Sequence, residues 1–238
     1  MNEKLKALVL AAGKGIRMLP VTDEIPKAMV EIAGKPILER ILDVLGEAGI
    51  KEVVIVVGYK KGQIMEYFGN EFRGMKIDYA VQEKQLGTAH AIGMARQFMQ
   101  GDFISINGDL LFESSLIKEL AGKSGFDAVI VGRKVQDLSR FAALEIEDGL
   151  VKNIIEKPRP GETKTDIINY GIYRFSKKIF DVIARTGINP IRNEYEITDS
   201  LKLMLNEGAE IACLLYNGFR IDISNSKDLE EANRMLKN

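Results

Sequence analysis

A loop that combines glycines with positive charges is the first stretch whose residue types could do chemistry. It follows an apolar run at residues 7–10, which predicts a strand. Gly13 and Gly15 lack a β-carbon, so their backbone can adopt positive φ angles and turn N–H groups toward an anion. We therefore predict a cradle for a triphosphate; the alternative is a strand-to-helix turn with solvated cations. The cradle would take its positive charge from three side chains: Lys14, Arg17 and Lys27.

Two common phosphate-binding loops do not fit this stretch. The dinucleotide fingerprint G-x-G-x-x-G needs a third glycine where Met18 stands. A Walker A loop fails as well. The only Gly-Lys-Ser of the chain, at 122–124, has Ile117 where the earlier glycine of that motif is required. The predicted cradle is therefore of neither type.

Two aspartates each follow a predicted strand. Asp109 comes after residues 103–107 and Gly108, and Asp222 comes after residues 219–221. A carboxylate at the carboxyl end of a strand can bind a hard cation, and magnesium usually takes one or two carboxylates together with substrate phosphates. We expect a Mg²⁺ site at these two aspartates. The alternative for Asp222 is an acid that flanks a helix at the surface.

Gln82 stands directly after the predicted strand at residues 77–81. A carboxamide can donate and accept hydrogen bonds at once, which matches the edge of uracil or thymine. On spacing alone, a polar loop before a helix is the ordinary interpretation.

Composition excludes several classes of function. Cys213 is the only cysteine, so the chain cannot assemble a thiolate metal site or an intrachain disulfide. His90 is the only histidine, which disfavours a catalytic triad of the Ser-His or Cys-His kind. The formal net charge of −1 gives no support to a nucleic-acid or membrane-surface partner. The N-terminal apolar run is too short for a signal peptide, and no apolar run has the length of a membrane span. We expect a cytoplasmic protein.

Strand and helix patterns alternate along the first 140 residues of the chain. Such a series predicts a doubly wound, mostly parallel Rossmann-like sheet in an α/β fold, with ligand groups at the carboxyl ends of its strands. The predicted strands cover 7–10, 53–57, 77–81, 103–107 and 128–131, and the predicted helices cover 37–48, 60–68, 88–99 and 113–121.

From residue 141 strands predominate. We expect a β-rich second half of one domain, because no flexible linker precedes it. The predicted strands cover 142–146, 151–156, 168–175, 210–215 and 219–221. The predicted helices cover 177–184, 197–206 and 227–236, the last with Ser226 as its N-cap.

The stretches LAAGKGIRMLP and PKAMVEIAGKP together resemble the signature of the sugar-1-phosphate nucleotidylyltransferases. The segment 81–91 resembles the base-reading segment of that family, especially in N-acetylglucosamine-1-phosphate uridylyltransferase domains. Glu156-Lys157-Pro158 and Asn169-Tyr170-Gly171 are similar to its sugar-binding segments.

The sequence departs from the family pattern at three places. Ile16 replaces a small hydroxyl residue of the cradle. Around Asp222 the family has W-x-D-x-G-T, where this chain has Arg220 and then Ser224-Asn225. Phe141-Ala142 stands where relatives often have Tyr-Gly, so the β-carbon of Ala142 narrows the approach of a sugar to that backbone. The identity of the sugar therefore stays open.

The resemblance implies a role for each matching residue. It implies a nucleotide-diphospho-sugar transferase-like fold over 1–238, with a nucleotide-binding half at 1–140 and a β-rich sugar-binding half at 141–238. The implied nucleotide-binding residues are Leu10, Ala12, Gly13, Lys14, Gly15, Gln82, Gly87, Thr88, Gly108 and Asp109. The implied sugar-binding residues are Ala142, Glu156, Lys157, Asn169 and Gly171. Arg17, Lys27 and Lys157 would stabilise charge in catalysis, and Mg²⁺ would bind Asp109 and Asp222.

The reaction that the resemblance implies is nucleotidyl transfer from a nucleoside triphosphate, UTP by preference, to a sugar 1-phosphate. Glucose 1-phosphate and N-acetylglucosamine 1-phosphate are both expected acceptors. The first alternative is a glucose-1-phosphate thymidylyltransferase that uses dTTP. The second is a non-catalytic nucleotide-sugar-binding regulatory protein. By analogy with relatives, we also expect a homo-oligomer without the C-terminal left-handed β-helix that many of them carry.

Overall fold

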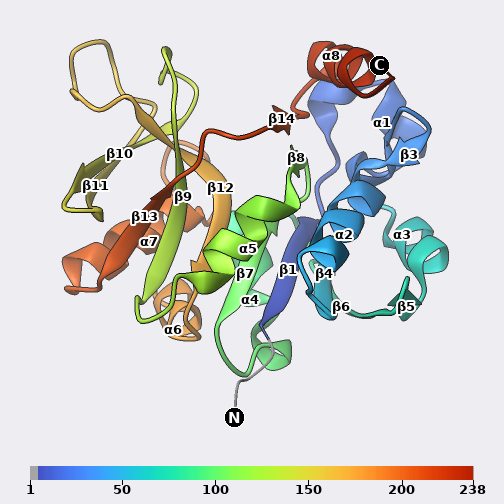
Figure 1. Cartoon of the computed structure of the whole chain (residues 1–238), viewed down its shortest axis with the longest axis horizontal. Coiled ribbons are helices and arrows are strands. Elements are labelled where there is room, and N and C mark those ends of the chain that lie inside the picture. Colours follow the sequence, from blue (N-terminus) through green and yellow to red (C-terminus); the bar gives the residue numbers. More distant parts are fainter. Residues whose placement is uncertain (1–4, 238) are drawn as a thin grey trace. The chain divides into compact units, whose positions relative to one another are not determined.

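The computed structural model describes residues 5–237 of the chain (Figure 1). The chain divides into two compact units, and both are discontinuous in sequence. Unit 1 takes Met1–Gln85, Ile106–Lys118 and Gly218–Asn238, and unit 2 takes Leu86–Ser105 and Glu119–Asn217. The predicted assignment of nucleotide to residues 1–140 and of sugar to residues 141–238 stays a prediction.

Unit 1 contains a parallel sheet at its centre. Strand β1 (Lys6–Ala11) pairs in parallel with β4 (Glu52–Val57), and β4 pairs in parallel with β6 (Met75–Val81). The short β5 (Glu71–Phe72) pairs antiparallel with β6. The run Val53–Val57 of β4 is buried throughout, as expected for a strand covered on both faces. The strands predicted at 7–10, 53–57 and 77–81 and their parallel pairing are confirmed.

Helices α2 (Ile37–Glu47) and α3 (Lys61–Phe68) also belong to unit 1. Pro36 precedes α2, and after its end Gly49 adopts a φ of +90°, which breaks the helical conformation. The apolar face of α2 is fully buried, through Ile37, Leu38, Ile41, Leu42 and Leu45. Short elements join the cradle to α2: η1 (Ile16–Met18), α1 (Val21–Glu24), η2 (Lys27–Met29), β2 (Glu31–Ile32) and β3 (Lys35–Pro36).

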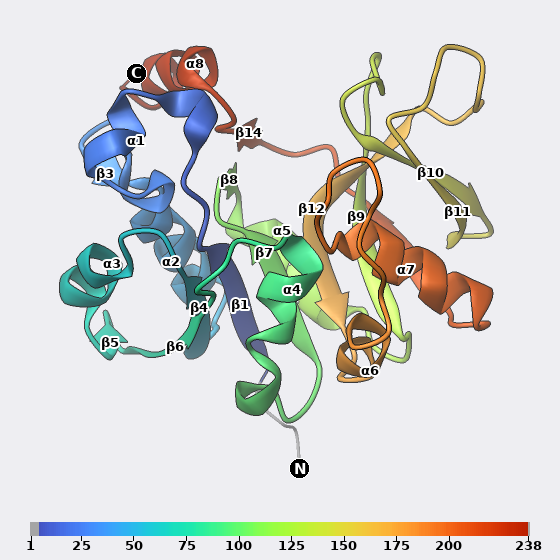
Figure 2. The same ribbon diagram turned by 180° about the vertical axis from the view of Figure 1, so that it is seen from behind.

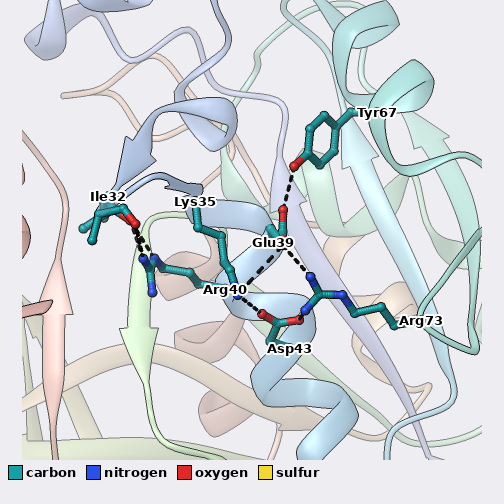
Figure 3. Close-up of polar contacts among 8 residues, drawn as sticks. Ile32, Lys35, Glu39, Arg40, Asp43, Tyr67 and Arg73 are labelled. Atoms are coloured by element: carbon teal, nitrogen blue, oxygen red, sulfur yellow. Dashed lines mark hydrogen bonds and ion pairs between the residues drawn. The ribbon is translucent and has the colours of Figure 1, made fainter. Parts of the chain in front are cut away.

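A charged network covers the other side of α2 (Figure 3). The carboxylate of Glu39, which is only 6% exposed, accepts hydrogen bonds from Tyr67 Oη at 2.7 Å and from Arg73 Nη2 at 2.8 Å. Asp43 accepts from Lys35 Nζ at 2.7 Å and is also paired with Arg73. The network compensates the burial of Glu39 and ties α2 to α3 and to the turn after β5.

A second small sheet in unit 1 joins segments that are far apart in the sequence. Strand β8 (Leu110–Phe112) pairs antiparallel with β14 (Arg220–Asp222), as Figure 1 shows. Helix α8 (Ser226–Lys237) follows β14. This pairing brings the chain around Asp222 beside the chain that follows Asp109.

The N-cap of α8 differs from the prediction. Ser226 is the first helical residue, and the side-chain oxygen of Asn225 accepts hydrogen bonds from the backbone N–H of Lys227 at 2.9 Å and of Asp228 at 3.2 Å. The Asp228 carboxylate accepts in return from the backbone N–H of Ser224 and Asn225, at 2.8 Å and 3.0 Å. Asn225 is therefore the cap, in a reciprocal arrangement of the capping-box kind.

Unit 2 contains a mixed sheet. Strand β9 (Ala128–Lys134) pairs in parallel with β13 (Ile211–Leu215) and antiparallel with β12 (Ile167–Phe175). The hairpin of β10 (Ala142–Glu147) and β11 (Leu150–Glu156) joins β13 through β11. The prediction that strands predominate after residue 141 is confirmed.

Helices α4 (Thr88–Gly93), α6 (Ile179–Ile183) and α7 (Ile197–Asn206) pack against one another in unit 2 (Figure 2). The helix predicted at 88–99 is shorter than expected, since α4 ends at Gly93 and a separate turn, η3 (Arg96–Phe98), follows. The ring of Phe103 stacks on that of Phe180, with centroids 5.3 Å apart. Strand β7 (Phe103–Asn107) and helix α5 (Ser114–Gly122) each contain a boundary between the two units, so part of each element is assigned to unit 1 and part to unit 2.

Among residues 5–237, no helix is both long and apolar enough to cross a membrane.

Candidate active site

The glycine loop follows β1 in unit 1, as predicted. Gly15 adopts a φ of +70°, whereas Gly13 is not among the residues with positive φ. A β-carbon at Gly15 would lie 2.9 Å from the β-carbon of Lys27, and Thr22 Oγ1 donates to the Gly15 carbonyl at 2.8 Å. Gly15 thus lets Lys27 pack directly against the loop.

The other two cations of the loop are exposed. The ammonium group of Lys14 lies 5.4 Å from the centroid of the Tyr59 ring, in a cation–π contact. The backbone N–H of Tyr59 donates to the Ala12 carbonyl at 3.1 Å. This bond holds the backbone that carries the Tyr59 ring beside the loop. Arg17 is also exposed, and Ile16, which replaces the hydroxyl residue of the family, is 67% exposed.

Lys27 forms an ion pair with Asp109. Its Nζ lies 2.6 Å from Asp109 Oδ2, and only 14% of the Lys27 side chain is exposed. The residue before Asp109 explains how the carboxylate reaches this position. A β-carbon at Gly108 would lie 2.4 Å from the Leu10 carbonyl oxygen, and the Gly108 N–H donates to that oxygen at 3.0 Å. This close backbone contact with β1 is enough to explain why residue 108 is a glycine.

Asp222 lies at the end of β14, opposite Leu110 of β8. The N–H of the next residue, Ile223, donates to the Asp109 carbonyl at 2.9 Å, so the two aspartates belong to one small cluster. Burial raises the pKa of the Asp222 carboxyl, and the nearby charge of Asp109 raises it further. The hydrogen bond from Ser224 and the charges of Arg220 and Lys27 act in the opposite direction.

The residues of this cluster fit a magnesium ion. Two carboxylates that repel each other supply only oxygen donors, which hard cations prefer, and a cation would relieve their repulsion. In the described part of the chain, no group of three or more His, Cys, Asp or Glu side chains is placed to hold a metal. A metal bound here would therefore complete its ligand set from a substrate, as magnesium does with phosphates.

Gln82 follows β6 directly, as predicted, and its side chain belongs to the interior of unit 1. The residue is 3% exposed, and its backbone N–H donates to the Val57 carbonyl at 2.8 Å. Gly58 brings this segment close to the cradle. A β-carbon there would lie 2.9 Å from both the Ala12 and the Gln82 carbonyl oxygens. The site of Gln82 is therefore adjacent to the strand end from which the glycine loop begins.

In unit 2, the segment around Gly87 packs against the backbone of Tyr195. Gly87 has a φ of +104°, and a β-carbon there would lie 2.5 Å from the Tyr195 carbonyl oxygen. Thr88 Oγ1 accepts from the Ile197 N–H at 3.0 Å and contacts Glu196 Oε2 at 3.3 Å. Burial raises the pKa of Glu196. These contacts give Gly87 and Thr88 a structural role in addition to their predicted role in nucleotide binding.

The predicted sugar-binding residues of the hairpin also lie together in unit 2. Ala142 of β10 is the cross-strand partner of Glu156 on β11. Lys157 is exposed, and its backbone N–H donates to the Phe141 carbonyl at 2.9 Å. Glu156 Oε1 accepts from Arg192 Nη2 at 2.8 Å, and this arginine also contacts Glu196 at 3.2 Å.

Asn169 and Gly171 lie at an irregularity of β12. The register with β9 shifts between Asn169 and Tyr173, and Gly171 adopts a φ of +83°. The Asn169 side-chain oxygen accepts from the Gly171 N–H at 3.0 Å. The side chain of Asn169 also forms a hydrogen bond with Tyr173, so its contacts hold this irregularity of β12, and its role as a donor to a sugar stays a prediction.

Sequence reasoning missed several residues that shape these sites. Gly58 carries a signal, because it is a glycine directly after an apolar strand. Tyr59 and Arg192 carry none, since an aromatic ring or a surface arginine in a loop is common. The two residues that hydrogen-bond the Asp222 carboxylate were visible only as departures from the family pattern: Arg220 and Ser224.

Known proteins resemble this chain over almost its whole length. The family model described as nucleotidyl transferase matches residues 6–238. The UTP–glucose-1-phosphate uridylyltransferase AglF of Haloferax volcanii is 36% identical over 239 residues, which cover 98% of this chain and 97% of that protein. The bifunctional protein GlmU of Methanococcus maripaludis strain C7 is 37% identical over 235 residues. The match covers 98% of this chain but 55% of GlmU, so the chain spans about half the length of the GlmU relatives.

Solved structures show the same fold. A Bacillus anthracis protein, provisionally assigned as a glucose-1-phosphate thymidylyltransferase and solved with sucrose, is 26% identical, with a TM-score of 0.85 over 98% of this chain and 96% of that one. A UDP-glucose pyrophosphorylase in complex with UDP-glucose has a TM-score of 0.86 over 98% of each chain at 24% identity, which supports the fold alone. With the family model matched along the described strands and helices, the chain belongs to the nucleotidyl transferase family.

Proposed function

We propose that this protein transfers a uridylyl group from UTP to a sugar 1-phosphate and releases pyrophosphate. The observation that carries the proposal is the cluster in unit 1, where the Lys27 ammonium lies 2.6 Å from Asp109 and Asp222 is held beside it. Such a cluster can hold a divalent cation and place a positive charge on phosphates. AglF, which is similar over the full length of both chains and is named for UTP and glucose 1-phosphate, supports the choice of substrates.

The bonding changes follow from the substrates. A phosphate oxygen of the sugar 1-phosphate attacks the α-phosphorus of UTP in line, and the bond from that phosphorus to the bridging oxygen of the β-phosphate breaks. Pyrophosphate leaves with the electron pair of that bond. The attacking phosphate monoester is mostly a dianion at neutral pH, since its second pKa is about 6, so no general base is needed. A reaction without a general base is compatible with a chain that has a single histidine.

The residues of the chain act through charge and position. Asp109 and Asp222 would hold Mg²⁺, which when bound neutralises phosphate charge. Lys14, Arg17 and Lys27 would bind the triphosphate, and Gln82 would hydrogen-bond the uracil edge. We assign Leu10, Ala12, Gly13, Gly15, Gly87, Thr88 and Gly108 to nucleotide contacts, mostly through backbone. Binding and orientation of two substrates supply most of the rate enhancement in such a site.

The sugar 1-phosphate would bind residues of unit 2. Glu156 would accept hydrogen bonds from sugar hydroxyls, Asn169 would donate to one, and Lys157 would neutralise the sugar phosphate. Ala142 and Gly171 would contact the sugar through their backbone. Glucose 1-phosphate and N-acetylglucosamine 1-phosphate are both acceptors in this proposal. By analogy with relatives we also infer a homo-oligomer, and small charged substrates support a cytoplasmic location. The formal net charge of −1 supports no nucleic-acid or membrane partner.

The decisive experiment measures pyrophosphate release over a grid of four nucleoside triphosphates and several sugar 1-phosphates, with Mg²⁺ or with a chelator. We expect turnover confined to UTP, with glucose 1-phosphate or N-acetylglucosamine 1-phosphate, and lost with the chelator. A preference for dTTP over UTP in competition would instead identify a thymidylyltransferase. Absence of turnover across the grid, with nucleotide binding that Asp109→Ala leaves unchanged, would favour a regulatory nucleotide-sugar-binding protein.

A further inference from the structure

Both oxygens of the Asp222 carboxylate are held by residues of the same segment. Arg220 Nη2 lies 3.2 Å from Asp222 Oδ2, and Ser224 Oγ donates to Asp222 Oδ1 at 2.6 Å. Residues two apart on a strand point to the same face, so β14 itself places the Arg220 guanidinium next to Asp222. The carboxylate is therefore oriented by its own chain segment.

Arg220 is a buried cation. Only 10% of its side chain is exposed, compared with 31% for Asp222. Burial of a guanidinium is unfavourable unless a negative charge compensates it, and a guanidinium stays protonated in proteins. Its position is also specific, because Arg220 is the cross-strand partner of Phe112 in the pairing of β14 with β8. A permanent positive charge is thus built into the wall of the proposed metal site.

Each carboxylate of this cluster has a cation in contact with it. Asp109 has Lys27 as its cation at 2.6 Å, and Asp222 has Arg220. A free divalent cation would have to displace Arg220 from Asp222 Oδ2 and would then lie beside its charge. A magnesium–triphosphate complex is negative overall, so the same guanidinium would attract it.

We propose that Arg220 is a positioning residue that makes the Asp109–Asp222 site selective for a metal–nucleotide complex over the free metal ion. Ser224 orients the same carboxylate without adding charge. The inference rests on the proposed metal site and adds a reason for the departure of this chain from the family pattern, since the arginine stands where the family has tryptophan. The consequence is that metal enters together with the triphosphate.

The test compares two dissociation constants measured without sugar 1-phosphate, so that no turnover occurs: that of Mn²⁺ alone, by electron paramagnetic resonance, and that of Mg–UTP, by calorimetry. Arg220→Met removes the charge and keeps most of the length. We expect it to bind Mn²⁺ alone at least about fivefold more tightly and Mg–UTP at least about fivefold more weakly, on the scale of one lost charge–charge contact. Arg220→Lys should keep both constants within about twofold. If Arg220→Met does not fold, Arg220→Gln replaces it with the same expectations.

Controls separate this inference from its alternatives. Arg73→Met breaks another arginine–carboxylate contact of unit 1, away from the cluster, and should leave both constants unchanged. Equal shifts of both constants in Arg220→Met, or none, would show a merely structural role and overturn the proposal. If Asp222→Asn and Asp109→Asn bind Mn²⁺ as tightly as the unaltered protein, the proposed metal site itself is wrong, which is a different result from a failure of the selectivity.

Discussion

The Lys27 ammonium donates to Asp109 Oδ2 at 2.6 Å, although 82 residues separate the two in the chain. The contact depends on two glycines with different tasks. Gly15 makes room for the Lys27 side chain, and Gly108 lets the chain before Asp109 contact β1. An ammonium group and a carboxylate of the proposed site are therefore held in direct contact by the backbone around them.

Lys27→Ala and Asp109→Ala should each lower turnover by at least about tenfold, since each removes a charge that the proposed reaction uses. The measurement is Mg²⁺-dependent pyrophosphate release. Lys35→Ala and Asp43→Ala are matched controls, because that pair has a similar distance of 2.7 Å in the same unit and should leave turnover unchanged. Rates close to those of the unaltered protein in both site variants would remove the metal and cradle assignments.

Gln82→Ala should reduce discrimination among nucleotides more than the maximal rate. Its buried carboxamide is proposed to hydrogen-bond the base, and loss of such a bond is worth about 1–3 kcal/mol, which corresponds to about fivefold to 150-fold in selectivity. The ratio of kcat/KM for UTP over CTP measures the effect. Gln63→Ala, in α3, removes an exposed glutamine of the same unit and should leave the ratio unchanged. An unchanged ratio in Gln82→Ala would assign base recognition elsewhere.

Gly108→Ala should destabilise the fold, because the new β-carbon would lie 2.4 Å from the Leu10 carbonyl oxygen. Overpacking against backbone has a typical effect of about 1–3 kcal/mol, so we expect Tm to fall by at least about 2 °C in thermal denaturation of a chain of this size. Gly62→Ala, in α3, is the control: nothing lies within 4 Å of a β-carbon there, and alanine favours a helix. Equal Tm values for the two variants would contradict the close contact.

Asn225→Ala should lower the stability of unit 1 by about 1 kcal/mol, the usual effect of losing an N-cap side chain. Ser226→Ala should have little effect, since Ser226 lies inside the helix. Chemical denaturation of the two variants gives the comparison. A larger loss for Ser226→Ala than for Asn225→Ala would restore the cap predicted from sequence.

Cys213 should react slowly with thiol reagents. Burial raises the pKa of the Cys213 thiol from 9.0 to about 12, so at pH 8 its reactive thiolate is scarce. Because the folded-state pKa is the higher one, this group favours the folded state below pH 9 and loses that contribution as the pH rises toward 12. Alkylation by iodoacetamide at pH 8 should be at least about a hundredfold slower than that of free cysteine, and should recover in denaturant. Fast alkylation of the folded protein would show an accessible thiolate.

Regular periodicity made most of the long elements predictable. The unbroken apolar run at 53–57 predicted a central strand, and the apolar spacing from residue 37 predicted a half-buried helix. The structure has both, as β4 and α2. Elements of two to four residues, such as β5 and α1, were missed because so short a stretch carries no period. The division into interleaved units depends on contacts between distant segments, which spacing along the chain does not reveal.

The places of the candidate residues in the fold were predictable, but the side chains that contact them were not. The strand ends locate Gly15, Gln82 and Asp109, because parallel strands place their carboxyl ends at one edge. The ion pair of Lys27 with Asp109 depends on packing between segments that are distant in the sequence. The contact of Arg220 with Asp222 depends on the pairing of β14 with the distant strand β8. The same limit applies to Arg192, whose two carboxylate contacts in unit 2 come from different elements.

The pairing of β8 with β14 also constrains the order of events during synthesis. Residues 110–112 emerge from the ribosome more than a hundred residues before their partner strand at 220–222. Until then β8 has an unpaired edge, and the carboxylate of Asp222 does not yet exist beside Asp109. Unit 2 can gather all its segments earlier, since its last residue is Asn217. A nascent chain therefore completes the segments of unit 2 before it completes the proposed metal site, and translation that stops before β14 leaves Asp109 without Asp222 beside it.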